Sequence, residues 1–189
     1  ELQFQEITFE FAHLNGKQTE TYEYVVKETT PALYYTASND VTVTVTLTNL
    51  GNGTLGVTVN PVAAFTNTYK ANDSDPVTIT GKKTLTGKTL VADQFSFELS
   101  GGKLSTPKTS KNDADGNFSF SPIVFEMADL GGKESEVFTF QVKEVVPESN
   151  PSGGITYDTS IYNVAVSVRD NKAGSIVIDS IVYTVGGVV

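Results

Sequence analysis

Apolar and polar residues alternate along most of the chain. The run Val41-Thr42-Val43-Thr44-Val45-Thr46 is the clearest case, because β-branched residues suit a pleated sheet with one buried face and one wet face. Further short runs separated by turn residues lie near 77–80, 94–99, 117–120, 123–127, 136–144, 161–168 and 175–185. No convincing helical period accompanies them. The pattern predicts an all-β fold, built as an antiparallel sandwich.

This pattern repeats along the chain with an offset of 116 residues. Residues 7–11 (Ile-Thr-Phe-Glu-Phe) return as 123–127 (Ile-Val-Phe-Glu-Met), and residues 21–28 return as 137–144. After a short insertion around 149–154, the strand expected at 41–47 is matched by 164–168. Several matches at one offset indicate two copies of one domain of about this length.

The offset divides the chain into three parts. Residues 1–69 correspond to the C-terminal half of a repeat, 70–76 read as a polar linker, and 77–189 form a nearly complete repeat that lacks its closing strand. The first sandwich is therefore expected to be incomplete. A half-sandwich exposes an apolar face and an unpaired strand edge, so we expect other strands to cover it. They would come from a longer protein or from a neighbouring subunit by strand complementation.

Composition excludes several classes of function. The chain has 189 residues, 39% of them hydrophobic, and its 22 acidic and 13 basic residues give a net charge of -9. A nucleic-acid surface would need clustered basic residues, so no nucleic-acid partner is expected. The absence of cysteine excludes disulfides and thiolate chemistry, and the single histidine makes a metal site or cofactor unexpected. No apolar run is long enough to span a membrane.

Five segments resemble one known family in order and spacing. They are 81–90 (Gly-Lys-Lys-Thr-Leu-Thr-Gly-Lys-Thr-Leu), 93–99 (Asp-Gln-Phe-Ser-Phe-Glu-Leu), 112–120, 140–144 and 154–158 (Gly-Ile-Thr-Tyr-Asp). Together they resemble the streptococcal pilin isopeptide linkage domain, a relative of the collagen-adhesin B-type modules of Gram-positive surface proteins. Residues 64–69 (Ala-Phe-Thr-Asn-Thr-Tyr) look like the closing strand of that family. The resemblance implies tandem Ig-like sandwiches of the collagen-adhesin B type.

The resemblance also implies a chemistry, in which a lysine on the first strand condenses with an asparagine on the last strand, assisted by a glutamate. Carried over, the lysine is Lys83, the assisting acids are Glu144 and Glu28, and the asparagine is Asn67, with Lys82 and Lys88 as competing lysines. In an apolar core an isolated ammonium is costly, so we expect a neutral, nucleophilic amine. A buried, protonated carboxyl group could polarise the asparagine carbonyl and shuttle protons while ammonia leaves.

Neither repeat contains all three groups. Residues 77–189 supply Lys83 and Glu144 without the asparagine, and residues 1–69 supply Glu28 and Asn67 without the lysine. Exchange of strands between subunits would bring the lysine of one chain to the asparagine of another. The plainer alternative remains that the acids are charged strand ends and that the asparagine belongs to a turn.

The leading functional hypothesis is a structural module of a stalk or pilus shaft, outside the cell on a wall or pilus. It would be stabilised by self-formed Lys–Asn bonds and would not be an enzyme with turnover. Neighbouring repeats or subunits are the expected partners. The alternative is an adhesin module whose loops bind a host glycan or protein, with tyrosines 34, 35, 157 and 162 as candidates. No arrangement favours a hydrolase, and Asp113-Ala114-Asp115-Gly116-Asn117 is interpreted as a hairpin turn rather than a calcium loop.

Overall fold

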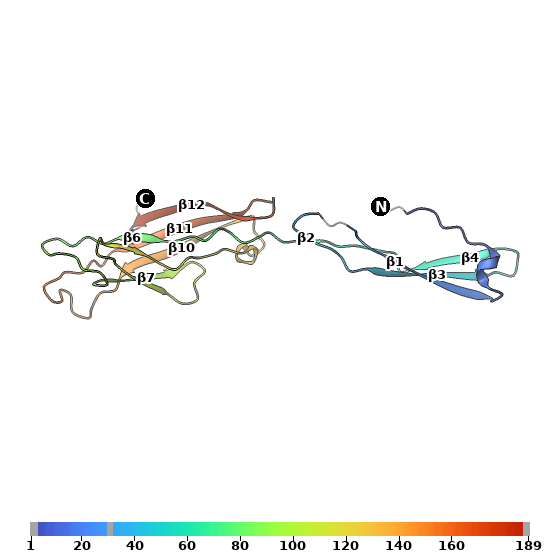
Figure 1. Cartoon of the computed structure of the whole chain (residues 1–189), viewed down its shortest axis with the longest axis horizontal. Helices are drawn as coiled ribbons and strands as arrows, with labels where there is room; N and C mark the ends of the chain where they lie inside the picture. The colour runs from blue at the N-terminus through green and yellow to red at the C-terminus, as the bar shows by residue number, and fades with distance from the viewer. Residues whose placement is uncertain (1–3, 30–31, 187–189) are drawn as a thin grey trace. The chain divides into compact units, whose positions relative to one another are not determined.

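A computed structural model describes residues 4–29 and 32–186, which divide into two compact units (Figure 1). Unit 1 is Glu1–Tyr69 and unit 2 is Lys70–Val189. Both consist of antiparallel strands joined by turns and short 3₁₀ helices, so the all-β prediction is confirmed. Among the described residues, no helix has the length and apolar character needed to cross a membrane.

Unit 1 contains a three-stranded sheet in the order β1-β3-β4. These strands are β1 (Thr19–Val26), β3 (Val41–Asn49) and β4 (Leu55–Asn60), and a separate pair joins β2 (Tyr35–Thr36) to β5 (Thr68–Tyr69). The alternation in β3 has the expected effect, because Val43, Val45 and Leu47 are buried. The β3 threonines Thr42, Thr44, Thr46 and Thr48 are more exposed.

Unit 2 contains a five-stranded sheet in the order β12-β11-β10-β7-β8. Its strands are β7 (Ser96–Gly101), β8 (Lys108–Lys111), β10 (Ser135–Glu144), β11 (Ile161–Asp170) and β12 (Ile176–Val185). A second ladder pairs β6 (Thr80–Lys82) with β9 (Asn117–Ser119). Isolated backbone hydrogen bonds between the chain before β6 and the chain after β9 extend this ladder, such as those between Val77 and Ile123.

Aromatic side chains fill the space between the two layers of unit 2. Phe97 of β7 stacks on Phe118 of β9 with ring centroids 3.7 Å apart, which ties the five-stranded sheet to the β6–β9 ladder. Phe95, Phe120 and Phe140 are buried around this contact. Burying a side chain of this size contributes about 1.5–3 kcal/mol, so these rings fix the distance between the layers. The result is a sandwich with one core.

The two units share elements at the 116-residue offset. The 3₁₀ helix η1 (Phe11–Leu14) corresponds to η2 (Met127–Leu130); each follows a capping glutamate, ends at a residue in the left-handed region, and buries its leucine. The sheet order β1-β3-β4 likewise corresponds to β10-β11-β12. In unit 2 the other edge of β10 pairs with β7, whereas no described strand pairs with that edge of β1. An apolar groove of about 700 Å³ lies against β1, β3 and β4.

Three segments differ from the sequence-based expectation. The strand expected at 123–127 is reduced to a bridge at Ile123, because the chain turns into η2 from Met127. Strand β8 was not anticipated, since Lys108-Thr109-Ser110-Lys111 contains no apolar residue and forms an edge of the sheet. Residues 70–76 are part of unit 2 rather than a free linker, because Ala71 and Ser74 are buried there.

Candidate cross-link site

Lys83 follows β6 directly and keeps the alternation of that strand. Its backbone N–H donates to the Gly116 carbonyl at 2.7 Å, so the strand direction continues past Lys82. Gly81 permits the approach of β6 to the core, because a Cβ there would lie 2.3 Å from the Phe118 ring. The Lys83 side chain consequently points inward, and 12% of it is exposed.

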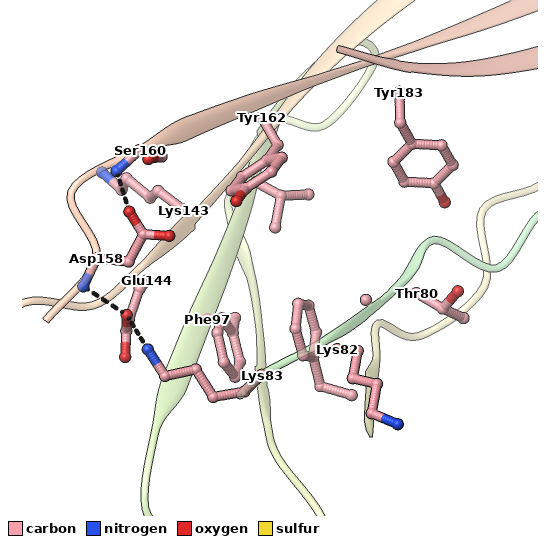
Figure 2. Close-up of a pocket in the computed structure, with 13 residues that line it drawn as sticks. Thr80, Lys82, Lys83, Phe97, Lys143, Glu144, Asp158, Ser160, Tyr162 and Tyr183 are labelled. Carbon is pink, nitrogen blue, oxygen red and sulfur yellow. Dashed lines mark hydrogen bonds and ion pairs between the residues drawn. The ribbon is translucent and has the colours of Figure 1, made fainter. Parts of the chain in front are cut away.

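Glu144 is the last residue of β10 and lies on the buried face of that strand. Phe140, Val142 and Glu144 alternate inward, which places a carboxylate at the end of an apolar row. Only 3% of its side chain is exposed, and the Lys83 amine donates to Oε2 at 2.7 Å (Figure 2). The same amine lies 4.5 Å from the centroid of the Phe95 ring. The structure therefore brings together the lysine and the glutamate expected for unit 2.

The two oxygens of Glu144 have unequal surroundings. Oε2 accepts both from Lys83 and from the backbone N–H of Asp158 at 2.9 Å. Oε1 is buried and has no hydrogen-bond partner among the described residues. Leaving a buried acceptor without a hydrogen-bond partner costs about 1–3 kcal/mol, so we expect a donor to pair with this oxygen.

Unit 1 shows what a donor at the equivalent oxygen looks like. Glu28, at the matching position after β1, accepts from Asn67 Nδ2 at Oε1 with a distance of 2.7 Å. Its Oε2 accepts from the backbone N–H of Ser38 at 3.2 Å, as Glu144 does from Asp158. Unit 1 thus holds a glutamate with an asparagine, and unit 2 holds a glutamate with a lysine.

Ser38 also positions the segment that carries Asn67. Its hydroxyl donates to the Thr66 carbonyl at 2.7 Å and accepts from the Thr66 N–H at 2.5 Å. One residue therefore holds Glu28 through its backbone and the asparagine segment through its side chain. Sequence reasoning missed this role, because a serine in a polar turn gives no distinctive signal.

The competing lysines lie elsewhere. Lys82 is exposed on the opposite side of the strand, and Figure 2 shows its amine directed away from Glu144. Lys88 is exposed in the turn that follows. Burial beside a carboxylate thus distinguishes Lys83 from both alternatives.

A pocket of about 160 Å³ opens beside the Lys83–Glu144 pair. Its apolar lining includes Phe97, Phe118 and Val142, and its polar lining includes Asp158 and Ser160. None of the described residues that line it is an asparagine. The pocket is a partly open space next to an amine, a carboxyl group and an acceptor that no described residue pairs with, and these groups suit a side chain with an amide group.

Asp158 fixes the loop on the far side of this pair. Its carboxylate accepts from the Ser160 backbone N–H at 2.8 Å, as Figure 2 shows, which orients its own N–H toward Glu144. Hydrogen bonding from the Ser160 side chain and then its backbone lowers the pKa of Asp158, and the positive charge of Lys83 adds to this effect. The carboxylate form is therefore the one that supports the fold.

Replacing Asp158 with asparagine is expected to cause a small loss of stability that depends on pH. A carboxyl group whose folded pKa lies below its unfolded value contributes above the unfolded value and loses that contribution as the pH falls through the folded pKa. The difference in unfolding free energy between the wild type and D158N should therefore be present at neutral pH. It should shrink as the pH falls below the ordinary value of 3.8. Urea unfolding at neutral pH and at a pH below 3.8 measures this difference in unfolding free energy. An equal difference at the two pH values would contradict the stabilising role of the Asp158 carboxylate.

Comparison with known proteins identifies the family of the chain. The family model described as "FctA: Spy0128-like isopeptide containing domain" matches residues 1–70 and 79–186. No curated protein and no solved structure matches the chain. The matched residues cover most of both units and include all four side chains expected to take part in the cross-link. The chain belongs to the FctA family of Spy0128-like isopeptide-containing domains.

Proposed function

We propose that unit 2 forms an amide bond between Lys83 and an asparagine side chain, with Glu144 moving the protons. The family is one of pilin-type structural modules of Gram-positive surface proteins, not of turnover enzymes. The observation that carries the proposal is the buried Lys83–Glu144 contact of 2.7 Å, together with a Glu144 oxygen that accepts from none of the described residues. An ordinary surface ion pair would have neither a buried lysine and glutamate nor a buried carboxylate oxygen without a donor.

The first chemical step is a proton transfer inside the pair. Moving one proton from the Lys83 amine to Glu144 converts an ammonium and a carboxylate into a neutral amine and a carboxylic acid. The net charge of the pocket does not change, so no uncompensated charge is created in a largely apolar surrounding. The Asp158 N–H holds the Glu144 carboxyl group in place during this transfer.

The bond then forms at the side-chain carbonyl carbon of the asparagine. The Lys83 Nζ atom attacks Cγ while the Glu144 acid donates a hydrogen bond to Oδ1 and polarises the carbonyl. The proton lost from Nζ passes through Glu144 to Nδ2, the Cγ–Nδ2 bond breaks, and ammonia leaves. The reaction happens once, and the fold provides the alignment that an encounter in solution would lack.

The bond would give the module mechanical strength without cysteine. It would tie the first strand of a sandwich to its last, so a pulling force would pass through a covalent bond rather than through the hydrogen bonds between strands. If the bond closes a loop of about a hundred residues and restricts the unfolded chain as a disulfide of that span does, it adds about 4–5 kcal/mol to the free energy of unfolding. This suits a stalk or pilus-shaft module that contacts neighbouring subunits on a cell surface.

A peptide tests the chemistry directly. A synthetic copy of residues 62–69 carries the asparagine that lies against Glu28 in unit 1. Incubated with the N67A variant of the chain, it is expected to add its own mass less one ammonia. Tandem mass spectrometry should place the link between Lys83 and the peptide asparagine. A peptide with alanine at that position and the K83R chain are the controls. An adduct on Lys82 or Lys88, or no adduct, would refute the proposal.

A further inference from the structure

The turn between β3 and β4 contains an asparagine followed by a glycine. Residues 50–54 (Leu-Gly-Asn-Gly-Thr) join the two strands, and all five are exposed. Gly53 has a φ of +83°, and no atom of the described residues lies within 4 Å of the position that a Cβ would take there. Solvent therefore has open access to the peptide bond between Asn52 and Gly53.

The Asn52 side chain is folded back over its own backbone. Its Oδ1 atom accepts from the Thr54 backbone N–H at 3.1 Å and also from the Thr54 hydroxyl. The first of these bonds closes an Asx turn, a small ring that contains both the Asn52 Cγ atom and the Gly53 nitrogen. The Gly53 N–H donates to none of the described residues. A free amide nitrogen thus lies beside a carbonyl that two donors already polarise.

We propose that Asn52 is a site of self-modification, at which the Gly53 nitrogen attacks Asn52 Cγ and forms a cyclic imide. The Gly53 N–H gives its proton to hydroxide, the N–Cγ bond forms, and negative charge develops on Oδ1. The Cγ–Nδ2 bond then breaks, and Nδ2 takes up a proton and leaves as ammonia. Water opens the imide at Cγ to give aspartate, or at the main-chain carbonyl carbon to give isoaspartate.

Two features of the turn favour this reaction. The Thr54 hydroxyl and N–H already point at Oδ1, where the charge of the tetrahedral intermediate develops, and preorganised donors at such an oxygen lower the barrier. Glycine has no Cβ to obstruct the approach of its own nitrogen to the neighbouring side chain. The attack closes a five-membered ring, so it has the advantage of an intramolecular step.

Two other asparagines each have one of these features. Asn49 forms the same kind of turn, with Oδ1 accepting from the Gly51 N–H at 2.9 Å, but the residue after it is Leu50. Asn15 is followed by a glycine, but it is the C-cap of η1 and its side chain is hydrogen-bonded to the Glu20 carboxylate. Within residues 4–29 and 32–186, only Asn52 combines a following glycine with two donors at Oδ1.

The reaction changes the charge of unit 1. Residues 49–55 contain no charged side chain, so the aspartate or isoaspartate introduces a negative charge into a neutral turn. Isoaspartate also adds a methylene group to the main chain and removes the Asx turn. The site uses neither Lys83 nor Glu144. Because the imide has lost one ammonia, as a Lys–Asn amide has, intact mass alone does not distinguish the two products.

Oxygen-18 labelling of the full chain tests this proposal. After incubation in enriched water at mildly alkaline pH, peptide mapping by tandem mass spectrometry should find heavy oxygen at residue 52 first, later at residue 15, and not at residue 49. The T54V variant keeps the N–H donor and loses the hydroxyl. It should slow labelling by roughly 2- to 10-fold, the factor that corresponds to one ordinary hydrogen bond. L50G places a glycine after Asn49 and should create a new labelled site there.

Urea separates the effect of the turn from that of the dipeptide. In the unfolded chain both Asn15 and Asn52 still precede a glycine, but the hydrogen bonds to Oδ1 are lost, so the two labelling rates should converge. If Asn52 keeps the same lead over Asn15 in urea, the local sequence sets the rate and the inference fails. Earlier labelling of Asn15 in the folded chain, or a wild-type rate in T54V, would also overturn it.

Discussion

Replacing Glu144 with glutamine is expected to slow formation of the Lys83 amide by about 10²- to 10⁴-fold, the range typical for loss of a general acid–base group. Glutamine keeps the shape and can still accept from the Asp158 N–H, but it cannot take the proton of the Lys83 amine. Adduct formation with the 62–69 peptide, followed by mass spectrometry, measures the rate. A rate within a few-fold of wild type would remove Glu144 from the chemistry.

The E144A variant should also show a large loss of stability before any bond forms. Removing one partner of a buried ion pair leaves the other charge uncompensated, at a cost of about 3–5 kcal/mol. The matched control is E98Q. Glu98 pairs with Lys143 at 3.0 Å on the neighbouring strand, but its side chain is 28% exposed and that of Lys143 is 49% exposed. Such a surface pair contributes about 0–1 kcal/mol, so E98Q should change neither stability nor reaction rate appreciably.

The strands of the chain could be predicted where the alternation was strong. The valines of β3 and the aromatic residues of β10 follow a period of two, and both strands are present. Strand β8 was missed because it has no apolar residue; its backbone pairs with β7, and Lys108 and Ser110 donate side-chain hydrogen bonds to residues 119–122. Tertiary position, rather than local pattern, makes Lys108–Lys111 a strand.

The site could be anticipated in its residue types but not in its geometry. Inward alternation after Phe140 and Val142 places Glu144 in the core, and the repeat offset then assigns Glu28 the matching place. No sequence pattern indicates that Oε1 of Glu144 has no partner in the described part of the chain while Oε1 of Glu28 accepts from Asn67. Those facts depend on side-chain positions across segments far apart in the chain, so only the structure supplies them.

The choice among the three candidate lysines also depends partly on the sequence and partly on the structure. Lys82 and Lys83 are adjacent, and strand alternation alone requires one of them to point inward without saying which. The contact of Gly81 with Phe118 settles it, because Gly81 faces the core and Lys83 lies two residues further along. The glycine allows the close approach, and the alternation then buries the next lysine on that face.

Gly116→Ala is expected to be among the most damaging small substitutions in unit 2. Gly116 has a φ of +88°, and a Cβ atom there would lie 2.1 Å from the Lys83 carbonyl oxygen. Because the obstacle is backbone, no side-chain rotation relieves it. The Gly116 carbonyl also accepts from the Lys83 N–H at 2.7 Å, so the turn and the lysine strand must separate. Left-handed strain alone costs about 1–2 kcal/mol, and we expect a total loss beyond about 3 kcal/mol.

Gly87→Ala is the control that has the backbone strain of a left-handed residue without the steric clash expected at Gly116. Gly87 has a similar φ of +77°, but no atom of residues 4–29 or 32–186 lies within 4 Å of the position its Cβ would take. G87A should therefore lose only about 1–2 kcal/mol of unfolding free energy and react with the 62–69 peptide at the wild-type rate. A displacement of about 1 Å at the reacting amine can cost about 10²-fold, so the folded fraction of G116A should react far more slowly. Urea unfolding and adduct rates on both variants measure this difference. Equal losses of unfolding free energy and of reaction rate in the two variants would mean that Gly116 does not set the position of Lys83.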